Sequence, residues 1–158
     1  MTSARDLLRA PPFLLGIAFA VLLCGSAQGV TLGNLKDAQL DDIYGTYAPG
    51  GDCKREPRIT VDESGLAFSH AGTSTHSGNI EYALSFGGPE YAGISRWLFP
   101  FPVDDNDFGR VLLTFNPDEK AGALAAESDL GPGQRLSALQ AALVASSPYA
   151  RCGKAPPR

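Results

Sequence analysis

The chain has 158 residues, with 13 Lys and Arg against 17 Asp and Glu, which gives a formal net charge of −4 at pH 7. No run of basic residues interrupts this acidic balance, so we expect no nucleic acid among its partners. The length suits one domain with its own hydrophobic core.

The N-terminal segment has the pattern of an export signal. A basic stretch containing Arg5 and Arg9 precedes an apolar run over residues 13–23, and small residues follow at 25–27. The apolar run is shorter than the ~20 residues that a membrane-spanning helix needs. We therefore predict a signal peptide over residues 1–27.

Removal of this signal leaves a single exported domain, residues 28–158, which is periplasmic or secreted and has no membrane span. A lipid anchor at Cys24 is disfavoured because Leu23, rather than a small residue, precedes it. Cys53 and Cys152 then remain, and an oxidising compartment favours a structural disulfide between them. Two buried free thiols are the alternative.

The periodicity of apolar residues changes along the domain. Helical spacing predicts a short amphipathic N-terminal helix through Leu32, Leu35, Leu40 and Ile43. Alternation then predicts strands at 58–61, 66–68, 80–86, 93–101, 111–115 and 123–126. Turns separate them at Asp62–Gly65 and, after the fourth strand, at Asp104–Asp107.

Two further segments complete the expected domain. The polar tract 69–78 contains no large apolar residue and is predicted to be a loop. Ser137 and Gln140 have the spacing of a capping box, which predicts a helix over 138–147, and we expect the polar tail after it to fray. The fold class is α+β: a meandering antiparallel sheet or half-barrel of about five to seven strands with a short N-terminal and a C-terminal helix.

Patterns for catalysis or metal binding are weak in this chain. His70 and His76 flank a loop that contains no carboxylate, so a third metal ligand is lacking and we predict no metal site. The acidic run at Asp104, Asp105 and Asp107 is too short for a calcium loop and lacks its distal Glu. No Gly-x-Ser-x-Gly motif is present, so we name no catalytic residue and no cofactor.

Aromatic residues alternate near the middle of the chain. Trp97, Phe99 and Phe101 would share one face of the strand over 93–101. Such a row fills a core or lines a pocket for an apolar ligand.

Two resemblances accompany these patterns. The segments Tyr47–Cys53 and Pro57–Val61, with one Cys near the C-terminus, resemble small exported domains of Gram-negative bacteria for which no activity is established. More loosely, Ser77–Tyr82 is similar to the Ser-Gly-x-x-Tyr motif of periplasmic lysozyme inhibitors, with one extra residue before the tyrosine. Those inhibitors are small antiparallel barrels that insert a loop into the lysozyme cleft, and this resemblance implies that Ser77 reaches the catalytic acids.

These observations predict a non-enzymatic exported protein that binds another extracytoplasmic protein, as an inhibitor or immunity-type partner of a hydrolase. Loop 69–78 would carry recognition, with Ser74, His76, Ser77 and Tyr82 as binding residues. The alternative is a carrier of a small apolar ligand that uses the aromatic strand face. A secreted enzyme and a structural envelope protein are further alternatives.

Overall fold

The structure, a computed structural model, describes residues 30–101 and 108–153. Its ten strands are β1 (Val30–Leu32), β2 (Gly45–Pro49), β3 (Arg58–Asp62), β4 (Gly65–His70), β5 (Thr73–Ser77), β6 (Ile80–Tyr82), β7 (Arg96–Phe99), β8 (Arg110–Phe115), β9 (Ala123–Asp129) and β10 (Tyr149–Arg151). One α-helix, α1, spans Ala138–Ala145, and four short 3₁₀ helices are η1 (Lys36–Ala38), η2 (Asp41–Ile43), η3 (Leu84–Phe86) and η4 (Pro117–Glu119). The predicted signal and the acidic run at Asp104–Asp107 lie outside the described residues.

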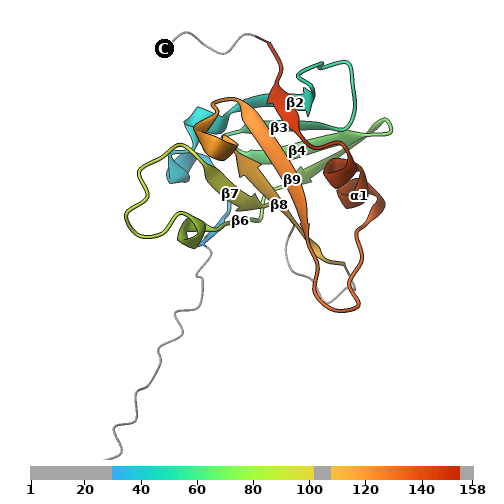
Figure 1. Ribbon diagram of the computed structural model, residues 1–158. Helices are drawn as coiled ribbons and strands as arrows, with labels where there is room; N and C mark the ends of the chain where they lie inside the picture. The colour runs from blue at the N-terminus through green and yellow to red at the C-terminus, as the bar shows by residue number, and fades with distance from the viewer. Residues whose placement is uncertain (1–29, 102–107, 154–158) are drawn as a thin grey trace, which may run out of the picture.

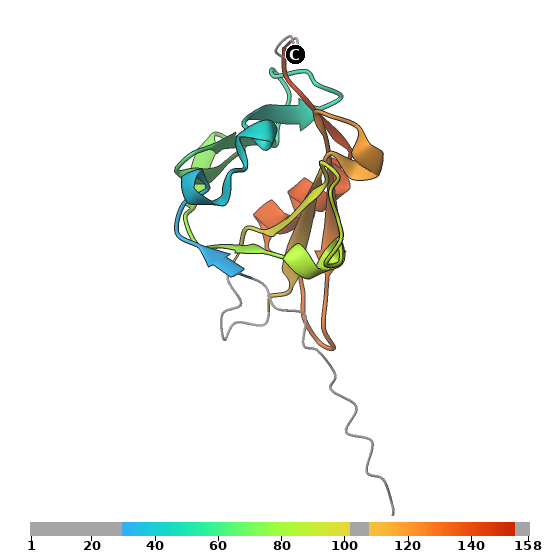
Figure 2. The same ribbon diagram turned by 90° about the vertical axis from the view of Figure 1, so that its left-hand side faces the viewer.

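The strands form one curled antiparallel sheet, a half-barrel, with the order β1-β6-β7-β8-β9-β10-β2-β3-β4-β5 (Figures 1 and 2). Two meanders, β2–β5 and β6–β9, make up most of it. The last strand of the chain, β10, lies between them and pairs with β9 on one side and β2 on the other. The three residues of β10 therefore join the two halves of the sheet.

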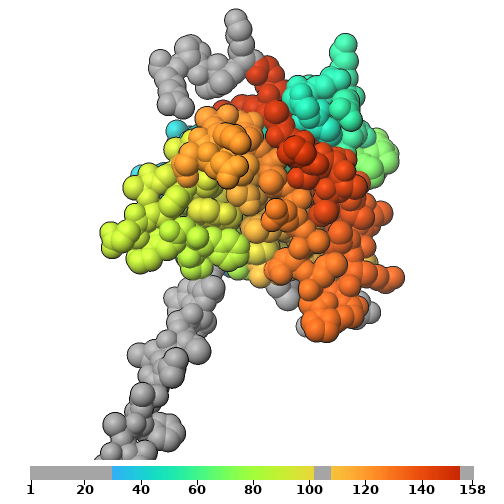
Figure 3. All heavy atoms as spheres, in the orientation of Figure 1, coloured from blue at the N-terminus to red at the C-terminus, as the bar shows by residue number. Residues whose placement is uncertain are grey.

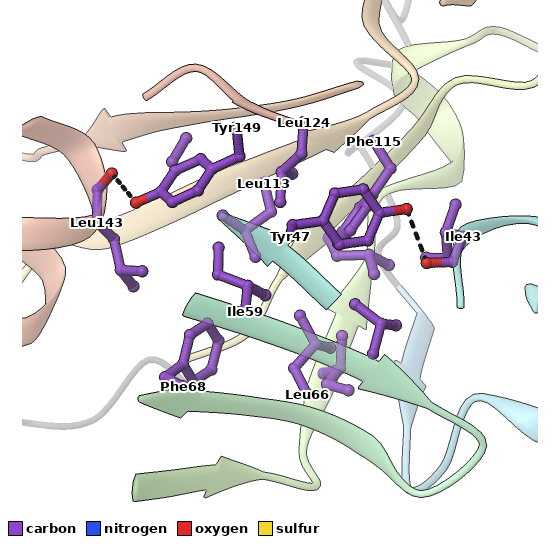
Figure 4. Packing of buried hydrophobic residues seen from close by; sticks show 14 of the residues in the cluster. Ile43, Tyr47, Ile59, Leu66, Phe68, Leu113, Phe115, Leu124, Leu143 and Tyr149 are labelled. Atoms are coloured by element: carbon purple, nitrogen blue, oxygen red, sulfur yellow. Dashed lines mark hydrogen bonds between the residues drawn. The ribbon is translucent and has the colours of Figure 1, made fainter. Parts of the chain in front are cut away.

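The concave side of the sheet holds the core (Figure 4). Alternate residues of each meander point into it, so Ile59, Leu66, Phe68, Leu113 and Phe115 are all fully buried. Two tyrosines lie in the core, and each hydroxyl donates to a backbone carbonyl. Tyr47 donates to the carbonyl of Ile43 at 2.9 Å, and Tyr149 donates to the carbonyl of Leu143 in α1 at 2.7 Å. Each hydrogen bond offsets the free-energy cost of burying the tyrosine hydroxyl away from water.

The expected half-barrel and C-terminal helix are confirmed, and so is the capping box. The Ser137 side chain accepts from the Gln140 backbone N–H, and the Gln140 side chain accepts from the Ser137 N–H. The hairpin turn at Asp62–Gly65 is also present between β3 and β4.

The predicted N-terminal helix is wrong. The chain instead forms β1 and the 3₁₀ helices η1 and η2, and Gln39 between these two has φ 54°, outside the right-handed helical region. Leu35, Leu40 and Ile43 are buried as their spacing suggests, but the Leu35 N–H donates to the Glu63 carbonyl of the β3–β4 turn. This contact draws the segment onto the sheet.

The predicted count of five to seven strands is also wrong. The tract 69–78 is mostly strand: it holds the end of β4 and all of β5, with the turn at Ala71 and Gly72. The supposed frayed tail contains β10. The predicted strand 80–86 ends at Tyr82, after which η3 begins, and β7 covers only four residues of the predicted strand 93–101.

Cys53 and Cys152 form the predicted disulfide, with Cα atoms 5.6 Å apart and 99 positions of separation in sequence. It connects the loop after β2 to the end of β10. The Cys152 N–H also donates to the Thr46 carbonyl of β2 at 2.7 Å. The disulfide thus closes the chain where the two sheet halves meet.

Replacing Cys53 and Cys152 together by Ser should lower the free energy of unfolding by about 3–5 kcal/mol, because a loop of this length regains its entropy in the unfolded chain. Urea unfolding followed by far-UV circular dichroism measures the loss. Wild-type protein treated with a reductant should show the same loss. A decrease below about 1 kcal/mol would contradict the structural role of the disulfide.

Candidate functional site

A cavity of about 820 Å³ lies where β6 ends and β7 begins. Three parts of the chain line it: the turn between η1 and η2, the end of β6 with the loop that follows, and the start of β7. In Figure 2 the blue turn and the yellow-green loop lie on opposite sides of the view. The lining residues are Ala38, Gln39, Leu40, Tyr82, Leu84, Ser85, Gly88, Pro89, Tyr91, Ala92, Gly93, Arg96 and Trp97.

Aromatic rings form one wall of this cavity. The Trp97 and Tyr91 rings have centroids 5.2 Å apart with an interplanar angle of 59°, and Phe86 packs against Trp97 at 6.3 Å. The loop that carries Phe86 and Tyr91 protrudes from the body of the molecule (Figure 3). A ligand in the cavity would therefore contact an aromatic surface that is open to solvent on one side.

The expected row of three aromatics divides into two groups. Phe99 lies near Trp97, and Phe86 packs edge-on against the Phe99 ring with centroids 6.1 Å apart. The guanidinium of Arg110 lies 3.5 Å from the centroid of the Phe99 ring. Phe101 packs instead against Phe68 of β4, with centroids 5.1 Å apart. Only Trp97 of the three lines the cavity.

Tyr91 is held in place by Glu119 from the β8–β9 turn. The Tyr91 hydroxyl donates to Glu119 Oε1 at 2.5 Å and accepts from the Ser95 N–H at 2.7 Å, while Glu119 Oε2 accepts from the Ile94 N–H at 2.6 Å. A side chain at Gly93 would come closer than 3.0 Å to both Tyr91 and Glu119, so this approach requires glycine. The hydrogen bonds from Tyr91 and Ile94 lower the pKa of Glu119.

Backbone strain is concentrated in the turn that presents Glu119. Asn116, Asp118 and Glu119 all have left-handed φ angles, of 51°, 53° and 60°. Left-handed non-glycine residues are costly and persist where the surroundings hold them. Here the Asn116 side chain donates to the Ile94 carbonyl at 3.0 Å and accepts from the Gly122 N–H at 2.8 Å. The turn is thus fixed from both sides and holds the loop over 84–95 against the sheet.

Arg96 is the one charged residue among the cavity's described lining residues, and it already has three partners in the protein. Its guanidinium donates to the carbonyls of Gly93 and Ser95 at 2.8 and 3.0 Å and pairs with the Asp42 carboxylate at 3.2 Å. Burial raises the pKa of Asp42, and the nearby Arg96 charge acts in the opposite direction. The ion pair neutralises this side of the cavity and ties η2 to β7.

The four predicted binding residues lie in two separate places. Ser74 and His76 are exposed on β5. Ser77 at the end of β5 is only 8% exposed, and its hydroxyl donates to the Pro100 carbonyl. The turn at Ala71 and Gly72 forms the tip of the hairpin, and Ser77 lies at the far end of β5 from it. Tyr82 lines the cavity.

The two histidines lie on opposite faces of the β4–β5 hairpin. His70 shares its face with the buried Phe68, whereas His76 pairs with Ala67 on the convex face. Within 30–101 and 108–153, no group of three or more His, Cys, Asp or Glu could hold a metal. His76 Nε2 does approach Ser64 Oγ at 3.4 Å, but that hydroxyl donates to Asp62 at 2.6 Å. The Ser64 hydroxyl thus donates to the Asp62 carboxylate and not to the His76 ring, so these three groups do not have the Ser–His–Asp order of a catalytic triad.

Sequence reasoning did not identify Gln39, Tyr91, Arg96 or Glu119 as site residues. A partial signal exists for Tyr91, because it stands among glycines and a proline in a segment with exposed apolar residues. The pairing of Tyr91 with Glu119 joins positions 28 apart and has no local sequence pattern.

Comparison with protein-family models, with curated proteins and with solved structures finds no match for this chain. In the part of the chain that the structure describes, no helix has the length and apolar character needed to cross a membrane.

Replacing Glu119 by Gln should release the loop over 84–95, because the substitution removes the charged acceptor of the Tyr91 and Ile94 hydrogen bonds. The amides of Ile94 and Ser95 should then exchange with solvent several times faster, as measured by NMR. Glu127→Gln on the exposed part of β9 is the matched control and should leave these amides unchanged.

The wild-type protein should show the same loosening in acid. Because the pKa of Glu119 is lowered in the folded state, its stabilising effect is complete above the usual glutamate pKa and is lost as pH falls through the lowered value. Equal protection of both amides in Glu119→Gln and wild type would contradict the role of Glu119.

Proposed function

We propose that this protein is a non-enzymatic binding protein that holds a small molecule with an apolar face in the cavity beside Trp97. The observation that carries the proposal is a cavity of about 820 Å³ with an aromatic wall already held in place by Glu119. This volume is in the range of small-ligand sites. A pre-organised wall lowers the entropy cost of binding.

The chemistry of the lining residues supports binding rather than catalysis. They include no His, Cys, Lys, Asp or Glu, and the one charged side chain, Arg96, is paired with Asp42. The hydroxyls of Ser85, Tyr82 and Tyr91 do line the cavity, but a hydroxyl nucleophile needs an activating base beside it, and none of the lining residues is a His, Asp, Glu or Lys. A secreted enzyme is accordingly the weaker proposal.

A second candidate function is recognition of another extracytoplasmic protein through the β4–β5 hairpin. β5 is an edge strand of the sheet, and its residues Thr73–His76 are exposed. An exposed edge strand can pair with a partner's strand, and its polar side chains can add specificity. The specific version is inhibition of a hydrolase such as lysozyme in the periplasm, with Ser74 and His76 in contact with the enzyme.

The cavity proposal predicts binding of the uncharged apolar fluorophore N-phenyl-1-naphthylamine. Trp97→Leu should weaken this binding about tenfold, because the largest ring of the wall is lost. Phe108→Leu, which alters a half-buried aromatic residue outside the cavity, is the control and should retain wild-type affinity. Binding that is equal in both variants would contradict the proposal, and so would a wild-type protein that binds neither this fluorophore nor an uncharged ligand with both an apolar face and polar groups.

The hairpin proposal predicts that the protein inhibits lysozyme on a cell-wall substrate. Combined Ser74→Ala and His76→Ala should weaken inhibition about tenfold, which is the effect of losing contacts at the centre of an interface. Ser128→Ala, on the exposed part of β9, is the matched control. Full lysozyme activity in the presence of excess wild-type protein would exclude this version.

A further inference from the structure

The charge of the cavity limits what it can bind. None of the described residues that line it is acidic, and the guanidinium of Arg96 already has two carbonyl acceptors and the Asp42 carboxylate. An anionic ligand would have to compete with Asp42 for Arg96, and a cationic ligand would find no counter-charge in the lining. Transfer of an unpaired charge out of water is costly. The ligand should therefore be uncharged.

The exposure of the cavity's rim argues against a wholly apolar ligand. Leu84 and Tyr91 at the rim are 51% and 36% exposed, and Gln39 and Ser85 are exposed as well. A molecule bound here keeps part of its surface in water. A ligand without polar groups would gain less from this open site than from an enclosed one.

Polar groups at the cavity are available to a ligand. Among the described residues, no hydrogen-bond partner is found for the side chains of Gln39, Ser85 or Tyr82, all of which line the cavity. They provide one amide and two hydroxyl groups, which can both donate and accept. Gln39 is held at the rim in a left-handed conformation, with φ 54°.

The aromatic wall complements these groups. The rings of Tyr82, Tyr91 and Trp97, with Pro89 beside them, offer flat apolar surfaces to the C–H face of a ring. The hydroxyl of Tyr91 is already committed to Glu119 and Ser95, so its ring is fixed and contributes a surface rather than a polar contact.

From this combination we propose that the cavity binds a neutral saccharide, a mono- or oligosaccharide whose ring packs on Trp97 and whose hydroxyls bond to Gln39, Ser85 and Tyr82. The inference rests on the proposed small-molecule function and specifies its ligand class. A sugar ring has an apolar C–H face and a perimeter of uncharged hydroxyls, which matches both kinds of lining group.

The test is isothermal titration calorimetry of the purified protein with maltotriose, cellotriose and chitotriose, each compared with the charged trimers of galacturonic acid and glucosamine. At least one neutral trimer should bind, and each charged trimer should bind more weakly than the best neutral one. Trp97→Leu should weaken saccharide binding about tenfold, and Trp97→Phe should restore much of it because a ring is retained.

Tyr82→Phe isolates the polar contact, because it removes only a hydroxyl. It should weaken saccharide binding about threefold to tenfold, the range for one neutral hydrogen bond, and leave binding of N-phenyl-1-naphthylamine unchanged. Tyr44→Phe, at a half-buried tyrosine outside the cavity, is the matched control.

The outcomes separate the two proposals. If none of the neutral trimers binds while N-phenyl-1-naphthylamine binds in a Trp97-dependent manner, the saccharide inference is overturned and the small-molecule function stands. If neither kind of probe binds, both proposals fail. Saccharide binding that is unaffected by Trp97→Leu would place the sugar elsewhere and overturn the inference.

Discussion

The pairing of β10 with β9 and β2 is the interaction on which the rest of this structure depends. Three residues near the C-terminus, Tyr149–Arg151, pair with both meanders and so join them into one sheet. Such a short strand is weak by itself. It is reinforced by the buried hydrogen bond from Tyr149 to α1 and by the disulfide that follows at Cys152. Burial raises the pKa of Tyr149 to about 12, as expected for a phenol inside the core.

Arg151 connects the β10 strand pairing to the candidate site through hydrogen bonds. Arg151 of β10 donates to the Tyr47 hydroxyl at 2.8 Å and to the Asp42 carbonyl at 2.6 Å. The Asp42 side chain in turn pairs with Arg96 at the cavity. The cavity wall is therefore fixed from two directions, by this chain of contacts from β10 and by Glu119 from the β8–β9 turn. A binding site on loops requires such support to be pre-organised.

Features with local signals could be predicted from the sequence, and features that depend on distant contacts could not. The capping box of α1 and the turn at Asp62–Gly65 follow from neighbouring residues, and the disulfide follows from having two cysteines after the predicted signal. β5 was missed because an edge strand with one buried residue shows no apolar alternation. β10 was missed because three residues are too few to display a period. The sequence pointed to Trp97 through the aromatic row and to Tyr82 through the inhibitor-like motif. That both line one cavity depends on the loop over 84–95, which Glu119 holds from a distant part of the sequence.

The cavity beside Trp97 is the proposed functional site. Trp97 is the only tryptophan in the chain, so protein labelled with 5-fluorotryptophan has a single ¹⁹F NMR signal. The most direct measurement is this spectrum before and after addition of the small-molecule extract of the cells that make the protein. If the cavity is the functional site, the signal shifts on addition of the extract and returns to its first position on dialysis. An unchanged ¹⁹F signal, together with ¹⁵N amide shifts confined to β5 when the cell's proteins are added, would contradict it and favour the hairpin.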